Sequence, residues 1–267
     1  MTPPVAQIKL YGERNTGTNF LEHLLRNNFT QPLLEGTANK QEKKQRRQMV
    51  KPLDGKLIAK IVKDRFDTRA SNVRLLPEGL GWKHTSPPLK YLQSVPGRAA
   101  ETLFLVLVKH PVFWSVSFLN RPYHSFFDYD GMTFSEFIRH PFVPTGRDNV
   151  EDPVYPSVVD LYAAKVDGYR KLIEMGVRHE IILYEQLIQD VGGFLARIGA
   201  RHGLVRRYPD RDIVRDAATK NDIATLADYR EKYRLDSVRS IVTPDDFDFI
   251  VQRFGTERLR WLGYSEA

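Results

Sequence analysis

The chain has 267 residues, of which 42% are hydrophobic and 11% aromatic, enough apolar material for a sizeable core. Charged residues make up 27%, which argues against a disordered or fibrous chain. The formal net charge of +7 favours an anionic ligand, an acidic polymer or a phospholipid surface, without choosing among them. There is no cysteine, which excludes a disulfide scaffold, a cysteine-ligated zinc site and a thiol nucleophile.

The same patterns bear on compartment and partners. No basic region followed by a long apolar run opens the chain, so we expect no signal peptide. The longest apolar run, residues 103–108, is too short to cross a bilayer, so we expect no transmembrane segment and a cytoplasmic protein. The sequence has no recognition helix, zinc finger or stacking motif, so we expect no nucleic-acid partner, and no pattern indicates an oligomeric state.

The predicted elements alternate between strands and helices. Apolar segments rich in strand formers predict strands at residues 5–11, 56–62, 102–108 and 180–183. Helical spacing of apolar residues predicts helices at residues 20–29, 111–119, 133–138, 157–175, 186–202 and 245–261. This order predicts a single α/β domain with a mostly parallel central sheet flanked by helices, and ligands bound beyond the carboxyl ends of the strands. We expect irregular loop insertions near residues 30–55 and 120–156.

The loop after the first predicted strand, residues 11–19, has the composition of an anion-binding loop. Gly17 permits a close approach of the backbone, and Arg14 adds a positive charge with a planar donor fork. Side-chain donors follow at Thr16, Thr18 and Asn19. The alternative is an ordinary capped helix with Thr16 or Asn15 as the N-cap. The loop lacks both the Gly-Lys-Ser/Thr ending of a Walker A loop and the three-glycine dinucleotide fingerprint.

A second strand-to-helix junction follows the apolar segment 102–108. Lys109 stands at the strand end, Pro111 suits the first turn of a helix, and Ser117 comes eight positions after Lys109. A cation leaving the strand and a hydroxyl on the same side of the helix can share one phosphate. The alternative is a buried strand that ends in a solvated turn, with Ser117 on a helix surface.

The two junctions, in this order, resemble those of the sulfotransferases that use 3′-phosphoadenosine 5′-phosphosulfate (PAPS). The family loop, Lys/Arg-Ser/Thr-Gly-Thr, is similar to residues 16–19, although Asn15 stands at the usual cation position and Arg14 precedes it. The resemblance implies a P-loop-NTPase-like sulfotransferase fold with PAPS as co-substrate and no metal. It implies that Lys109 and Ser117 hold the 3′-phosphate, and that the 5′ end of the donor is held by Arg14, Asn15, Thr16, Gly17, Thr18 and Asn19.

The segment 81–88 lies between the two junctions and contains Lys83 and His84. Cytosolic members of the family carry a similar Lys-x-His segment, so the resemblance implies that His84 is the catalytic base. A neutral imidazole suits proton abstraction at neutral pH. Lys83, with Arg14, would stabilise charge on the transferring group. Glu13 and His110 are competing candidates for the base.

Later segments resemble further family features. Tyr184 follows the last predicted strand, where the family has a tyrosine near the adenine, although a plain strand-edge tyrosine is the alternative. Basic residues that would close over the 3′-phosphate are Arg230, Lys232 and Arg234, which the sequence does not rank. Apart from the resemblance, the aromatic residues after Pro122 either belong to the core, which is the default for such residues, or line an acceptor pocket; they are Tyr123, Phe126, Phe127 and Tyr129.

The resemblance implies transfer of a sulfuryl group to a hydroxyl or amine of a small molecule or glycan, with a carbohydrate among the acceptors. The alternatives are a nucleotide-dependent kinase or other phosphotransferase, and a non-catalytic domain that binds an anionic glycan or lipid. The basic run over residues 40–51 is either a solvated surface or a docking surface for an acidic acceptor or membrane.

Overall fold

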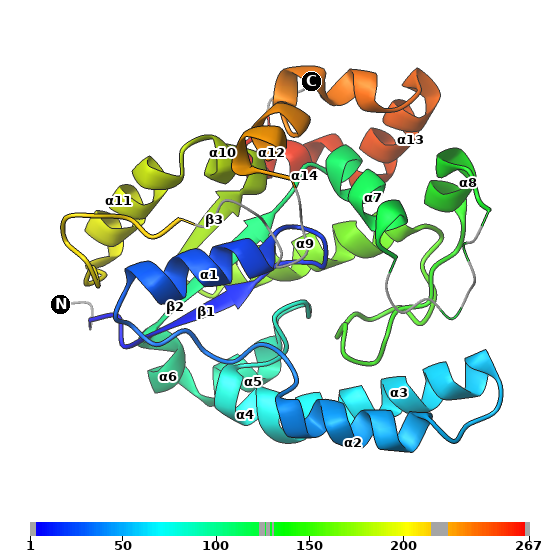
Figure 1. The fold of residues 1–267 in the computed structure, drawn as a ribbon, viewed down its shortest axis with the longest axis horizontal. Coiled ribbons are helices and arrows are strands. Elements are labelled where there is room, and N and C mark those ends of the chain that lie inside the picture. The colour runs from blue at the N-terminus through cyan, green and yellow to red at the C-terminus, as the bar shows by residue number, and fades with distance from the viewer. Residues whose placement is uncertain (1–3, 123–125, 127–128, 130, 215–223, 265–267) are drawn as a thin grey trace.

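The computed structural model describes residues 4–122, 126, 129, 131–214 and 224–264. A sheet of three parallel strands runs in the order β1-β2-β3, namely β1 (Gln7–Tyr11), β2 (Thr102–Val108) and β3 (His179–Leu183). All 7 residues of β2 are buried, because this strand has a neighbour on each side and helices over both faces (Figure 1). The pairing brings the carboxyl ends of the strands to one edge. The predicted α/β class with a parallel sheet is therefore confirmed.

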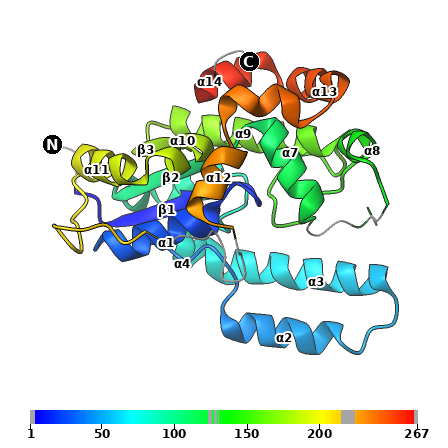
Figure 2. The ribbon, with the colours of Figure 1, turned by 45° about the horizontal axis from the view of Figure 1, so that its top comes forward.

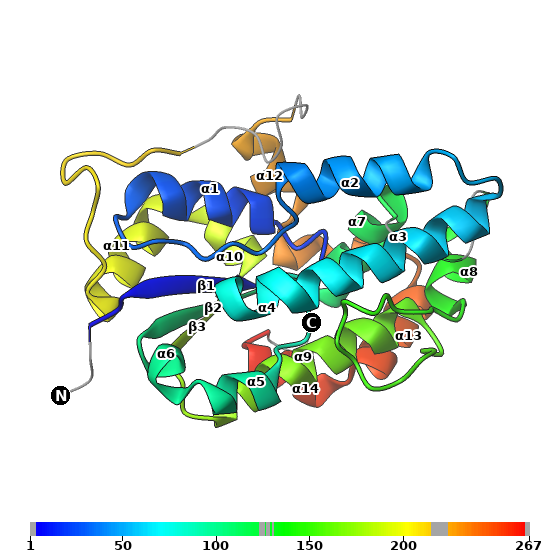
Figure 3. The ribbon, with the colours of Figure 1, turned by 90° about the horizontal axis from the view of Figure 1, so that it is seen from below.

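Helices α1 (Thr18–Asn28) and α9 (Val158–Glu174) lie on opposite faces of the sheet, with α1 in front and α9 behind in Figure 1; Figure 3 shows the same order from below. Two further helices begin directly beyond strand ends, α7 (Pro111–Asn120) after β2 and α10 (Tyr184–Gln189) after β3. The N-termini of α1, α7 and α10 therefore face the same edge of the sheet. Backbone N–H groups at such helix starts attract anions.

The strand predicted at residues 56–62 is wrong, because this segment opens helix α3 (Lys56–Ala70). It forms a hairpin with α2 (Lys40–Val50), beside the rest of the molecule in Figure 2. Leu57 and Ile58 are each 54% exposed, so their apolar character reflects no buried strand. The apolar cluster suggested a strand. The structure shows a helix of 15 residues that includes this cluster and the polar residues after it.

Residues 40–50 are helical, whereas we expected an irregular loop. Asn39 supplies the start signal for α2, since its side chain accepts a hydrogen bond from the Glu42 amide at 2.9 Å while the Glu42 carboxylate accepts from the Asn39 amide at 2.7 Å. This capping box and the many lysine, arginine and glutamine residues favour a solvated helix.

Two predicted helices are each divided in the structure. Residues 186–202 fall into α10 and α11 (Val191–His202), because Asp190 leaves the helical conformation and caps α11 through the Gly193 amide at 2.8 Å. Residues 245–261 fall into α13 (Pro244–Phe254) and α14 (Thr256–Leu262), which meet at Gly255 with φ of 92°. The other elements are π-helical turn η1 (Ser71–Leu75), α4 (Leu76–Gly79), α5 (Leu89–Ser94), α6 (Pro96–Ala100), α8 (Phe134–Arg139), α12 (Leu226–Lys232) and 3₁₀ turn η2 (Leu235–Ile241). Among the described residues, no helix combines the length and apolar character needed to cross a membrane.

Candidate functional site

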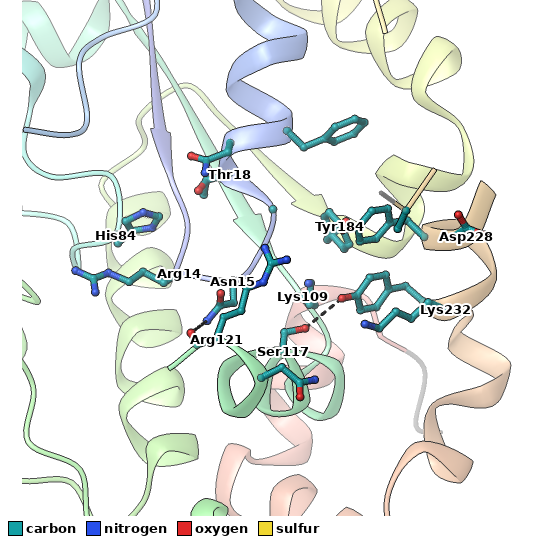
Figure 4. Close-up of a pocket in the computed structure, with 17 residues that line it drawn as sticks. Arg14, Asn15, Thr18, His84, Lys109, Ser117, Arg121, Tyr184, Asp228 and Lys232 are labelled. Atoms are coloured by element: carbon teal, nitrogen blue, oxygen red, sulfur yellow. Dashed lines mark hydrogen bonds between the residues drawn. The ribbon is translucent and has the colours of Figure 1, made fainter. Parts of the chain in front are cut away.

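A cavity of about 440 Å³, which we call the strand-edge cavity, opens beyond the carboxyl ends of the strands (Figure 4). Predicted site residues that line it are Arg14, Asn15, Gly17, Thr18, Asn19, His84, Lys109, Ser117, Tyr184 and Lys232. In Figure 4, Tyr184 and Lys232 lie toward one end, and Arg14 and His84 toward the other. Segments far apart in the sequence therefore meet around one space with two chemically distinct ends.

The loop between β1 and α1 presents backbone donors to this cavity. Gly17 is the N-cap of α1 with φ of 96°, and no side chain caps the helix. The capped helix with Thr16 or Asn15 as N-cap is therefore wrong. Among the described residues, the amides of Thr18 and Asn19 have no hydrogen-bond acceptor. A helix start left open in this way suits an anion.

Neighbouring side chains hold the loop in this shape. Thr16 is fully buried and donates to the Glu13 carbonyl at 2.6 Å, so it braces the loop and does not line the cavity. The indole N–H of Trp114 donates to the Arg14 carbonyl at 2.8 Å, which ties the loop to α7. Asn15 has φ of 65° and donates to the Arg121 carbonyl at 3.3 Å. The loop is therefore preorganised by its own hydrogen bonds and by contacts with α7 and its C-cap, Arg121.

Lys109 is buried at the other end of the cavity. Its Nζ lies 4.2 Å from the centroid of the Tyr184 ring and 4.3 Å from that of Tyr233, which makes two cation–π contacts. Burial lowers the pKa of Lys109 to about 7, with Glu185 opposing this shift and Lys232 adding to it. A phosphate beside the ammonium group would stabilise its charged form.

Ser117 shares this end of the cavity with Tyr233. The Ser117 hydroxyl donates to the Phe113 carbonyl at 2.7 Å, and the hydroxyl oxygens of Ser117 and Tyr233 are 3.2 Å apart. Tyr233 follows α12, so it joins the C-terminal part of the chain to α7. Sequence reasoning missed Tyr233, although its spacing from Tyr229, which also lines the cavity, is that of one helix face.

His84 lines the strand-edge cavity near Arg14 (Figure 4). Its Nδ1 is 2.7 Å from the Gly12 carbonyl oxygen, and because a carbonyl only accepts, Nδ1 carries the proton. Nε2 of the neutral ring is then the acceptor. Burial, Lys83 and Arg14 hold the pKa of His84 well below 6.5, so the ring is neutral at physiological pH.

Strand β1 fixes the segment that carries His84. Lys9 and Tyr11 are fully buried, and their side chains donate to the carbonyls of Gly81 and Leu80, respectively. The Gly12 amide donates to the Lys83 carbonyl at 2.9 Å. Buried polar groups in β1, which sequence periodicity does not explain, thus position the candidate base.

Neither competing base reaches the strand-edge cavity. Glu13 is fully buried and pairs with Lys165, which also pairs with Asp148. His110 caps α7 and accepts from the Val112 amide at 3.3 Å, and burial lowers its pKa to about 4. Both residues hold the scaffold around the cavity and do not line it.

Lys83 does not line the strand-edge cavity. Its Nζ donates to Asn19 at 2.8 Å and pairs with Glu22 at 2.8 Å. Burial lowers its pKa, although Glu22 opposes the shift. Lys83 therefore braces the start of α1 and lines an adjoining cavity of about 610 Å³, which we call the hairpin cavity because α2 and α3 form one wall.

The structure separates the three basic candidates near the C-terminus. Lys232 lines the strand-edge cavity. Arg230 donates to the Ile188 carbonyl at 2.8 Å, Arg234 pairs with Asp236, and both line a different hollow. Asp228 also lines the strand-edge cavity, and no motif in the sequence singled it out.

None of the described aromatic residues that were expected in an acceptor pocket lines either cavity. Tyr123 and Phe127 lie outside the described residues. Phe126 and Tyr129 line neither cavity, and the Tyr129 ring packs edge-on against Phe137 with centroids 5.1 Å apart. The wall beyond His84 comes instead from Trp82 and the α2–α3 hairpin.

Two comparisons with known proteins find no match. A scan of the sequence against models of protein families finds no match, and neither does a search of curated proteins. Within the part of the chain that the structure describes, no cluster of three or more histidine and acidic residues has metal-binding geometry.

Proposed function

We propose that the protein is a PAPS-dependent sulfotransferase with a P-loop-NTPase-like fold. One observation carries the proposal: the loop amides at Thr18 and Asn19 and the buried cation Lys109 line one cavity. Its volume of about 440 Å³ suits a nucleotide-sized ligand. A ligand with an anionic group at each of two sites fits this pair of anchors, and PAPS carries a 5′-phosphosulfate and a 3′-phosphate.

The residues divide the work by position. Lys109, with Ser117 and Tyr233, binds the 3′-phosphate, and Lys232 adds positive charge on the same side. The Tyr184 ring, which packs against Lys109, provides an aromatic surface for the adenine. The open N-terminus of α1 and Arg14 bind the 5′ end. Arg14 stacks over Trp82 at 4.6 Å, which orients its guanidinium group near His84.

The chemistry is a displacement at sulfur. The acceptor oxygen or nitrogen forms a bond to sulfur, while the bond from sulfur to the bridging oxygen of the 5′-phosphate breaks. Its electron pair stays on the phosphate oxygen and gives 3′-phosphoadenosine 5′-phosphate (PAP). Nε2 of His84 takes the acceptor proton, and the loop N–H groups with Arg14 stabilise the charge on the leaving phosphate.

Thermal unfolding with PAP, AMP and magnesium-ATP tests the donor assignment. We expect PAP to raise Tm most, because only PAP satisfies both anchors, and a ligand at 100 times its Kd adds about 2.7 kcal/mol of stability. A larger shift with magnesium-ATP would indicate a phosphotransferase. Equal shifts that vanish with salt would indicate a non-catalytic anion-binding domain. Transfer of radiolabelled sulfate from PAPS to a panel of glycans, phenols, steroids and lipids then tests catalysis.

A further inference from the structure

The hairpin cavity adjoins the strand-edge cavity at the candidate base. Arg14, Asn19 and His84 line both spaces. The proposed function puts the donor in the first space, so an acceptor that gives its proton to His84 has to approach from the second. At about 610 Å³, the hairpin cavity has room for a small molecule or the end of a glycan.

The lining of this cavity is strongly cationic. Glu22 is the single carboxylate among the described residues that line it. The cationic lining residues are Arg14, Lys43, Arg46, Lys63, Lys83 and Arg147. Glu22 pairs with Lys83, and buried Asp67 pairs with Arg46 at 3.0 Å and with Arg147 at 3.3 Å. These carboxylates leave an excess of positive charge around the space.

Lys43 and Lys63 carry much of that excess. Neither has an ion pair with a described residue, and they face the cavity from the two helices of the hairpin. Burial is the main cause that lowers the pKa of Lys63, and the positive charge of Arg46 lowers it further. Nearby Asp67 opposes both effects. Bringing an anion into the cavity would offset the repulsion among these cations.

The cationic wall is rigid as well as charged. The guanidinium groups of Arg14 and Arg147 lie over the Trp82 ring at 4.6 and 4.2 Å from its centroid. Arg147 is 9% exposed, and its Nε has no hydrogen-bond partner. Cations held in place before a ligand arrives, with Arg147 among them buried, favour ligands that supply the missing negative charge.

We propose that the hairpin cavity binds the acceptor, and that Lys43 and Lys63 select one with an oxyanion group, such as a carboxylate or sulfate, near its reacting hydroxyl. This inference rests on the proposed function for its catalytic meaning. A neutral acceptor would leave the positive charge around Lys63 uncompensated. The cavity therefore favours an anionic acceptor over a neutral one of the same shape.

A matched pair of probes tests the charge requirement. Trigalacturonate and its methyl ester have the same sugar hydroxyls and differ in charge. With PAP-saturated protein, we expect calorimetry to show that trigalacturonate binds at least tenfold more tightly than the ester. The double substitution Lys43→Met and Lys63→Met should weaken trigalacturonate binding roughly tenfold. The control is Lys44→Met with Lys51→Met, which removes the same charge from exposed positions outside the cavity and should change affinity less than twofold.

The outcomes separate this inference from the proposed function. Equal affinity for acid and ester, or equal losses in the two double variants, would overturn the inference while PAP binding stands. Failure of PAP to bind would overturn the proposed function and the acceptor role with it. The same titration without PAP would then still decide whether Lys43 and Lys63 form an anion site.

Discussion

A Cβ atom added to Gly17 would lie 2.3 Å from the Tyr184 ring, so the anion loop and the tyrosine after β3 are in direct contact. Gly17 also has φ of 96°, which side-chain-bearing residues rarely adopt. We expect Gly17→Ala to lower the free energy of unfolding by about 2–3 kcal/mol and to weaken PAP binding, because the ring has to move. Urea denaturation and thermal shifts with PAP measure both effects.

Gly97→Ala is the matched control for that substitution. Gly97 lies in α6, and a Cβ atom there would meet nothing within 4 Å. We expect this substitution to leave PAP binding unchanged and to raise the free energy of unfolding by less than about 1 kcal/mol. Similar behaviour of the two variants would mean that the Gly17–Tyr184 contact places no constraint on the loop.

A second prediction concerns the buried ion cluster beneath His84. Lys165 pairs with Glu13 and Asp148, all three are buried, and the Lys165 ammonium donates to the His84 carbonyl at 2.8 Å. Lys165→Met leaves two buried carboxylates without their cation, so we expect the free energy of unfolding to fall by about 3–5 kcal/mol at neutral pH. Lys171→Met on the same helix, where the side chain is 57% exposed, should cost less than about 0.5 kcal/mol.

The pH dependence distinguishes charge from packing in this cluster. Burial raises the pKa of Asp148, but Lys165 and Arg14 outweigh it and hold the pKa below its usual value. The native protein therefore gains stability from Asp148 above its unfolded pKa, and loses it as the pH falls through the native value. Without Lys165, the buried Asp148 carboxylate would protonate more readily, so the difference in the free energy of unfolding between Lys165→Met and wild type should shrink toward about pH 4. A constant difference would assign the effect to packing alone.

The fold was predictable from the sequence where burial and periodicity agree. The strand at residues 102–108 is fully buried, and its apolar run identified it. Residues 56–62 misled because Leu57 and Ile58 are apolar and β-formers surround them, yet both are largely exposed on a helix. A short stretch of sequence does not reveal whether a strand there would pair with another strand of the sheet.

The candidate site divides in a similar way. Local patterns singled out the loop at Gly17 and the junction at Lys109, and the structure brings them to one cavity. Local patterns did not single out Tyr233 or Arg147, whose roles depend on contacts across the fold. Nor could they rank Lys232 above Arg230, because the two residues lie two positions apart in α12 and the packing of that helix decides which side chain faces the cavity.

Lys109 gives a third prediction, on proton uptake. Because burial lowers its pKa to about 7 and Lys232 adds to the effect, the side chain of the free protein is partly neutral at neutral pH. A bound 3′-phosphate would raise that pKa, so PAP binding at pH 7 should take up roughly half a proton, and affinity should fall as the pH rises above 7. Calorimetry in buffers of different ionisation enthalpy measures the uptake.

Two substitutions at this position make the test specific. Lys109→Arg keeps a permanent charge, so it should bind PAP with no proton uptake at this site. Lys109→Met should lose affinity for PAP by roughly tenfold or more and also abolish the uptake. Undiminished uptake in Lys109→Arg would show that another group titrates on binding.

The last prediction concerns His84 and the pH dependence of turnover. His84→Gln keeps the size and polarity of the side chain but removes the basic nitrogen, so kcat should fall by about 10²–10⁴-fold with little change in PAP affinity. Since burial, Lys83 and Arg14 hold the pKa of His84 well below 6.5, the base stays neutral under mildly acidic conditions. We therefore expect kcat of the wild type to stay level from about pH 8 down to about pH 6 and to fall only at lower pH. Replacing Lys83 with Met removes a nearby positive charge, so it should move the fall in kcat to higher pH. A full-strength His84→Gln enzyme, or a wild-type kcat that halves near pH 6.5, would show that the proton goes to a different group.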